Sequence, residues 1–178
     1  MKEQRDFTIP FVGLKIGIHT YKFEINNAFF EDFEYDEFNN TNVHLDVLLD
    51  KKATLLEFTL DFKGLVNVNC DITNEPYDQG LSGTYHFVVK FGEAFNDENE
   101  DLLILPHGSH EVDIRQYIYE SIVLAMPARR IHPGVADGTL QSDILDKLEE
   151  LSPKGQEDEE NRSTDPRWDD LKKLLTDK

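Results

Sequence analysis

Alternation of apolar and polar residues between Thr54 and Lys63 is the feature that most constrains the fold of this chain. A period of two residues is that of a β-strand, and one apolar face beside one polar face is typical of an antiparallel sheet with a single solvated side. The sequence therefore predicts a half-buried strand here, whose inward face carries Leu56, Phe58, Leu60 and Phe62.

Neighbouring segments show the same pattern and predict further strands. Residues 43–49 alternate, and Asp50–Ala53 is short enough to close a hairpin onto the strand that follows. Residues 85–91 alternate as well, and residues 14–25 do so with a change of phase near His19. Successive short connections favour a meander, in which each strand pairs with the next along the chain.

Two segments are expected to interrupt these strands. Gly64 is expected to end one strand before a further one continues through Val66 and Val68 to Cys70. Residues 73–83 are rich in Asn, Pro, Asp and Gly, so we expect them to form a loop.

Apolar residues at helical spacing predict helices mainly in the second half of the chain. Asp113, followed three residues later by Gln116, resembles a capping box, and Pro127 is expected to end that helix. Residues 141–151 suggest another helix, and residues 26–33 a short one. The predicted fold is therefore α+β, a mostly antiparallel four- to six-stranded meander sheet with one or two packed helices.

The C-terminal residues form a separate part of this prediction. We expect an α+β domain over residues 1–151, an acidic flexible linker over 152–164 and a tethered amphipathic helix over 165–178. Trp168 and Leu171 lie on the apolar face of that helix. It could dock on its own domain or on a partner, and the linker, which lacks apolar residues, favours the partner.

The chain of 178 residues carries a net charge of −18. This charge disfavours a broad electrostatic grip on RNA, which requires clustered Lys and Arg, and favours a basic protein partner. Cys70 is the only cysteine, so no disulfide can form within the chain. There is no apolar run of membrane-spanning length and no secretion signal, and we expect a cytoplasmic protein.

Few residues suggest chemistry, and we expect neither an enzyme nor a cofactor. The carboxylates of residues 31–37 are interpreted as a solvated charge run, and His107 and His110 as loop residues without a metal. Cys70 is interpreted as a buried or half-buried free thiol. Two alternatives stay open: a small-ligand or metal-binding β-domain using Cys70 and the Tyr77 loop, and a metal-dependent hydrolase using those carboxylates and histidines.

One locally basic segment follows the helix that is expected to end at Pro127. Its residues Arg129 and Arg130, with His132 and Pro133 just after them, could clamp a phosphate or could pair with carboxylates of the same chain. The sequence leaves these two interpretations open.

Several motifs together resemble the YceD-like family, the large ribosomal RNA subunit accumulation proteins. They are Gly17-Ile-His-Thr-Tyr-Lys-Phe23, the cysteine at a strand end (Cys70), the run 113–127 with its Leu-Ala-Met-Pro end, His132-Pro133, and Asp165-Pro-Arg-Trp168 with the residues through Leu171. The resemblance implies a non-enzymatic role in making or stabilising large-subunit ribosomal RNA, and possible metal and nucleic-acid binding through a Cys-x-Arg-Cys pattern. Here Ile72 and Thr73 replace the last two residues of that pattern, so we expect no metal.

The resemblance and the charge together suggest a division of labour. The acidic body is expected to hold a basic ribosomal protein or a large-subunit assembly intermediate, while basic side chains touch RNA or a second factor. Direct contact with ribosomal RNA is possible but disfavoured by the net charge, and no membrane is expected to be involved. The candidate partner-binding residues are Arg129, Arg130, His132, Arg167, Trp168, Leu171, Lys172 and Lys173.

Overall fold

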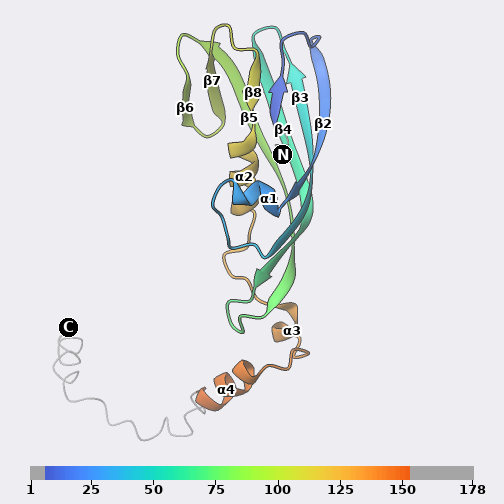
Figure 1. Ribbon diagram of the computed structural model, residues 1–178, viewed down its shortest axis with the longest axis vertical. Coiled ribbons are helices and arrows are strands. Elements are labelled where there is room, and N and C mark those ends of the chain that lie inside the picture. The colour runs from blue at the N-terminus through green and yellow to red at the C-terminus, as the bar shows by residue number, and fades with distance from the viewer. Residues whose placement is uncertain (1–6, 153–178) are drawn as a thin grey trace, which may run out of the picture. The chain divides into compact units, whose positions relative to one another are not determined.

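The computed structural model describes residues 7–152 and has a mixed α+β fold, as predicted. The described strands are β1 (Thr8–Pro10), β2 (Gly17–Asn26), β3 (Asn40–Lys51), β4 (Leu55–Asn69), β5 (Pro76–Gly92), β6 (Asn96–Asn99), β7 (Leu102–Pro106) and β8 (Glu111–Asp113). The described helices are α1 (Asn27–Glu31), α2 (Arg115–Leu124), α3 (Pro133–Ala136) and α4 (Asp143–Leu151) (Figure 1).

Two compact units divide the chain, the first ending at Leu140 and the second beginning at Gln141. Helix α4 belongs to the second unit, and none of its residues is buried. Its apolar residues Ile144, Leu148 and Leu151 are exposed. From residue 153 onward, the predicted linker and the predicted helix over 165–178 lie outside the described residues.

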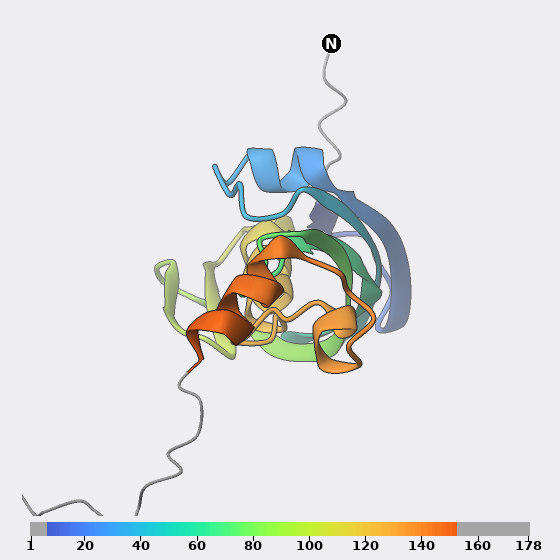
Figure 2. The same ribbon diagram turned by 90° about the horizontal axis from the view of Figure 1, so that it is seen from below.

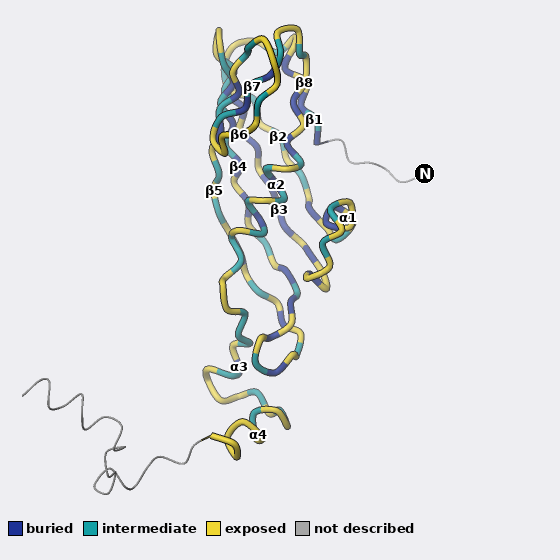
Figure 3. The backbone as a smooth tube through the Cα atoms, turned by 90° about the vertical axis from the view of Figure 1, so that its left-hand side faces the viewer, coloured by how far each residue is buried: buried dark blue, intermediate teal, exposed yellow. Residues whose placement is uncertain are grey.

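A six-stranded sheet in the order β2-β3-β4-β5-β7-β6 forms the frame of the first unit, and β1 and β8 pair separately. From β2 to β5 each strand pairs antiparallel with the next, which confirms the predicted meander over this part. The inward-facing residues of β3 and β4 are almost entirely buried. Figure 3 shows the resulting alternation of buried and exposed positions along the strands.

Strand β4 does not end at Gly64, contrary to the prediction. It runs without a break from Leu55 to Asn69, and Gly64 pairs with Val43 of β3. A Cβ atom on Gly64 would lie 2.6 Å from the Cα of Val43 and would overlap the carbonyl oxygen of Asn42. The glycine therefore permits a close approach of two backbones, as glycine in a strand interior often does.

The predicted loop over residues 73–83 is also wrong, because β5 already begins at Pro76. β5 pairs with β4 over its whole length, and proline can begin a strand without losing a ladder hydrogen bond. Gly83 lies opposite Phe62, whose ring would be 2.6 Å from a Cβ atom at that position. Pairing with a long partner strand outweighs the loop-like composition.

The meander ends at β5, which pairs with β7 in parallel. The hairpin of β6 and β7 makes this possible, because β6 turns the chain back before β7 returns along β5. The register begins only at Val88 of β5, opposite Leu102. The earlier part of β5 therefore has a strand neighbour on the β4 side alone, within the described residues.

Helix α2 and the residue that precedes it cover the inner face of the sheet through Ile114, Ile118 and Ile122, which are fully buried. The predicted apolar stripe is thus confirmed, but the predicted capping box is wrong. Asp113 ends β8, its carboxylate accepts a hydrogen bond from the backbone N–H of Arg115, and Gln116 instead bonds Glu120. Because Asp113 belongs to β8 and pairs with β1, the helix begins only after it.

Short helix α1, which was expected near residues 26–33, supplies an aromatic cluster beside α2. Phe29 and Phe30 are buried, and Phe33 stacks on Tyr119 of α2 with ring centres 4.4 Å apart. Figure 2 shows the curvature of the sheet beneath these elements. Among the described helices, none is long and apolar enough to cross a membrane.

Candidate functional site

Three residues that the sequence singled out separately, Cys70, Arg130 and His132, lie together at the turn between β4 and β5. The backbone N–H of Asp71 donates to the carbonyl oxygen of Arg130 at 2.7 Å, and the backbone N–H of His132 donates to Cys70 Sγ at 3.3 Å. These contacts join the turn to the segment between α2 and α3, up to 62 residues further along the chain. We call Cys70, Asp71, Arg130 and His132 the Cys70 cluster.

The turn from Cys70 to Glu75 is closed by its own backbone. The N–H of Cys70 donates to the carbonyl oxygen of Glu75 at 2.9 Å, and the N–H of Asn74 donates to that of Cys70 at 2.8 Å. Asn74 has a φ of 57°, a left-handed conformation that asparagine tolerates better than most residues. The turn thus fixes the position of the thiol.

Cys70 is a free thiol, 2% exposed, as the sequence predicted. Burial alone would raise the pKa of this thiol. Hydrogen bonds from the backbone N–H of His132, from the hydroxyl and backbone of Thr73, and from the backbone of Ile72 outweigh burial and lower the pKa to about 7. The folded chain therefore stabilises the thiolate, whereas an exposed thiol in the unfolded chain does not.

This lowered pKa predicts a pH-dependent contribution to stability. Since the pKa of Cys70 falls from 9.0 to about 7 on folding, its contribution is complete above pH 9 and is lost as the pH falls through 7. We expect the free energy of unfolding of the wild type, minus that of Cys70→Ala, to increase between these values by about 2–3 kcal/mol. Denaturant unfolding at several pH values measures this difference, and a constant difference would show that the thiolate is not stabilised.

Arg130 bridges two segments by ion pairs. Its guanidinium lies 2.8 Å from a carboxylate oxygen of Glu37 and 3.3 Å from one of Asp71, and its backbone N–H also bonds Asp71 at 2.7 Å. The side chain is 30% exposed. Burial would lower its pKa, but the two carboxylates raise it. Of the two interpretations of this arginine, internal pairing agrees with the geometry.

A hydrogen bond and a ring contact hold the imidazole ring of His132 in place. Its Nδ1 accepts a hydrogen bond from the backbone N–H of Gly134 at 2.9 Å, so it caps the start of α3, where Pro133 occupies the first position. Its ring lies against that of Tyr77 with centres 5.4 Å apart. The structure therefore gives this histidine a positioning role beside Cys70.

The other candidate residues are placed differently. Arg129 is exposed and makes no described ion pair. Arg130 is held by Asp71, which the sequence did not single out, and by Glu37, which was considered only within the carboxylate run 31–37. Nothing in an acidic sequence marks which carboxylates pair. The remaining candidates, Arg167, Trp168, Leu171, Lys172 and Lys173, lie outside the described residues.

The donor set of the Cys70 cluster does not fit zinc, which needs three or four ligands. Ile72 and Thr73 offer no second thiolate, and His132 Nδ1 already accepts a hydrogen bond. Across residues 7–152, no three His, Cys, Asp or Glu side chains are arranged to hold a metal ion, those of residues 31–37, His107 and His110 included.

Comparison with protein families gives one match. A family model described as large ribosomal RNA subunit accumulation protein YceD matches residues 58–175, well over half of the chain. The match includes β4 from Phe58 onward, the Cys70 cluster and α2. Searches among curated proteins and among solved structures found no match.

Proposed function

Since the chain belongs to the YceD family of large ribosomal RNA subunit accumulation proteins, we propose that it is a non-enzymatic binding protein in ribosome biogenesis. It supports the synthesis, processing or stability of large-subunit ribosomal RNA in the cytoplasm by holding a basic ribosomal protein. Family membership supports a role in ribosome biogenesis. The net charge of −18 is the observation that supports a basic protein as the partner.

The distribution of carboxylates supports a cationic partner. They gather in three exposed segments: the connection from α1 to β3, the β6–β7 hairpin, and α4. Within the described residues, few of them pair with a cation. The three groups are Glu31, Asp32, Glu34, Asp36 and Glu37; Asp97, Glu98, Glu100 and Asp101; and Asp143, Asp146, Glu149 and Glu150.

Charge of one sign speeds the capture of an oppositely charged partner and repels a polyanion. Ribosomal RNA needs several free cations to neutralise its phosphates. Arg130 is engaged with Glu37 and Asp71, which leaves Arg129 as the free guanidinium of the described basic segment. These facts favour a basic protein over RNA as the direct partner.

The proposal is tested by measuring binding of the purified full chain to isolated large-subunit proteins and, separately, to large-subunit ribosomal RNA. Each measurement is made at low and at high salt. We expect at least one basic protein to bind, with an affinity that falls as salt screens the charges, and we expect no binding of RNA alone.

A matched pair of variants sharpens this experiment. Changing Glu31, Asp32 and Glu34 together to amides removes charge from one acidic segment, and changing Thr20, Asn42 and Ser82 to alanine alters as many exposed residues without changing charge. The first variant is expected to weaken binding more than the second. Failure to bind both proteins and RNA, or preference for RNA, would refute the proposal.

A further inference from the structure

A cavity of about 490 Å³ opens beside β5, at the place where β7 has not yet joined it. The residues that line it include Thr59, Thr84, Tyr85, His86, Phe87 and Asp101. It shares no residue with the Cys70 cluster. We call this cavity the β5 notch.

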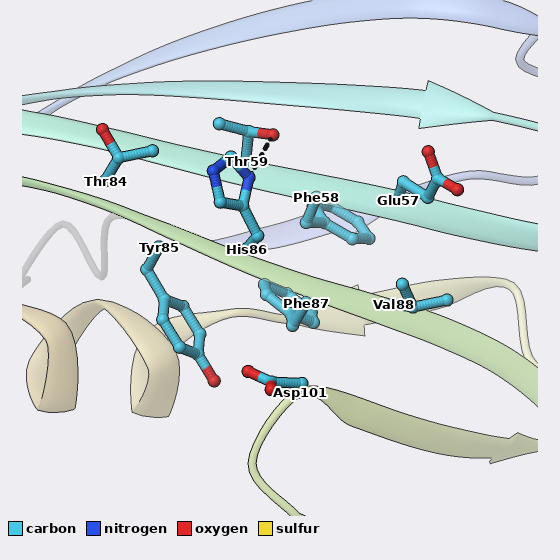
Figure 4. A pocket seen from close by; sticks show the side chains of 9 residues that line it. All are labelled: Glu57, Phe58, Thr59, Thr84, Tyr85, His86, Phe87, Val88 and Asp101. Atoms are coloured by element: carbon cyan, nitrogen blue, oxygen red, sulfur yellow. Dashed lines mark hydrogen bonds between the residues drawn. The ribbon is translucent and has the colours of Figure 1, made fainter.

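Aromatic rings lie at the floor of the β5 notch, where Phe87 is buried and Tyr85 is partly exposed. The ring of Phe87 stacks on that of Tyr117 from α2, with centres 4.1 Å apart and planes 12° from parallel. Tyr85 lies nearly parallel to both rings, with centres 6.0 and 6.2 Å away. Figure 4 shows the ring of Tyr85 reaching past β5 toward Asp101, whereas His86 bonds Thr59.

Carboxylates surround these rings. Burial raises the pKa of Tyr85, and the nearby charges of Asp101, Glu120 and Glu100 raise it further. Burial likewise raises the pKa of Tyr117 to about 12, with contributions from Tyr85, Asp97 and Glu120. The rings therefore lie in a strongly negative field.

Of the two carboxylates that line the notch, Glu57 pairs with Lys52, and Asp101 forms no ion pair within residues 7–152. Asp97, Glu100, Asp101 and Glu120 are exposed, and none of them forms an ion pair within residues 7–152. The described hydrogen bond to the Glu120 carboxylate comes from the neutral amide of Gln116. The Tyr85 ring beside the unpaired carboxylate of Asp101, with further unpaired carboxylates nearby, is complementary to a cation with a flat face.

We propose that the β5 notch binds the guanidinium group of an arginine presented by a basic protein. A guanidinium stacks on aromatic rings and pairs with a carboxylate through two hydrogen bonds at once. The same carboxylates repel the phosphates of RNA. The chemistry of the notch specifies which side chain is recognised. The identification of the protein that carries it as ribosomal rests on the proposed function.

The test is an NMR titration of the full chain with a short synthetic peptide that contains one arginine among serines. A second peptide contains citrulline, which has the shape of arginine without its charge, and a short RNA oligonucleotide is a third probe. We expect the arginine peptide to shift the signals of Tyr85, His86 and Asp101, and the citrulline peptide to bind on the order of tenfold more weakly.

Two variants locate the binding. Asp101→Asn is expected to lower the affinity for the arginine peptide on the order of tenfold, because it removes the charge at the rim. Asp46→Asn removes the same charge from an exposed position of β3, outside the three acidic segments, and is expected to leave affinity unchanged. Thermal melts of both variants confirm that they are folded.

Equal binding of the arginine and citrulline peptides, equal weakening by the two variants, or a response at the notch to RNA alone would each overturn the inference. Its failure is distinguishable from that of the proposed function. If a large-subunit protein binds the wild type and Asp101→Asn equally, the notch is not the site although the function stands. If no such protein binds, the function fails, and the peptide titration still decides what the notch binds.

Discussion

Gly64→Ala is expected to lower the free energy of unfolding by about 3 kcal/mol, because the added methyl group has no space. Its Cβ would lie 2.6 Å from the Cα of Val43 and would overlap the carbonyl oxygen of Asn42. Backbone atoms cannot turn aside as a flexible side chain can, so β3 and β4 must separate at the middle of the sheet. Denaturant unfolding of the two proteins measures the loss.

Gly80→Ala is the matched control for this change. Gly80 lies in the adjacent strand β5, opposite Leu65, and a Cβ there would meet only the end of that leucine side chain, at 3.9 Å. We expect its stability to remain within about 0.5 kcal/mol of the wild type. Equal losses at Gly64 and Gly80 would show that a general cost of replacing glycine, and not the close approach of β3, explains the effect.

Phe30→Ala is expected to lower the free energy of unfolding by about 3–5 kcal/mol, the usual cost of removing a buried aromatic ring. Phe30 is 2% exposed, and its ring centre lies 5.0 Å from that of Phe38 and 5.2 Å from that of Phe29. It also contacts Tyr119 of α2. Its removal would leave a void between α1, α2 and the start of β3.

Phe95→Ala is the control, because this phenylalanine is 57% exposed and lies outside the core. We expect a change of less than about 1 kcal/mol there. Urea unfolding of wild type and both variants provides the comparison. If Phe30→Ala costs no more than Phe95→Ala, the aromatic cluster does not hold α1 against the first unit.

Local periodicity explains how much of the fold could be predicted. The alternation in β3 and β4 and the apolar stripe of α2 reflect which residues face the core. This can be read from the order of apolar and polar residues within each segment. The starts and ends of elements depend on distant partners. Gly64 looked like an interruption because the reason for a glycine there, the close approach of β3, cannot be seen in neighbouring residues. Residues 76–83 looked like a loop because their pairing partner, β4, is a different segment of the chain.

The candidate site was predictable only in parts. Cys70 was correctly predicted to be a buried or half-buried free thiol, and His132 and Arg130 were noticed. Their contact depends on a fold that brings together residues up to 62 positions apart. The β5 notch was not predicted, since Tyr85 and Phe87 read only as an alternating strand. Nothing local shows that β7 joins β5 only at Val88 and leaves the preceding residues with β4 as their one described strand neighbour.

The bond from the His132 N–H to the Cys70 sulfur makes the thiol a built-in reporter of folding order. A hairpin of β4 and β5 can form from nearby residues, but that donor arrives only when the chain beyond α2 has returned to the turn. In an intermediate that lacks this return, the pKa of the Cys70 thiol stays closer to its ordinary value, and the thiol is more accessible to alkylating reagents. Pulse labelling of this single cysteine during refolding therefore times the return of this segment to the turn without any introduced probe.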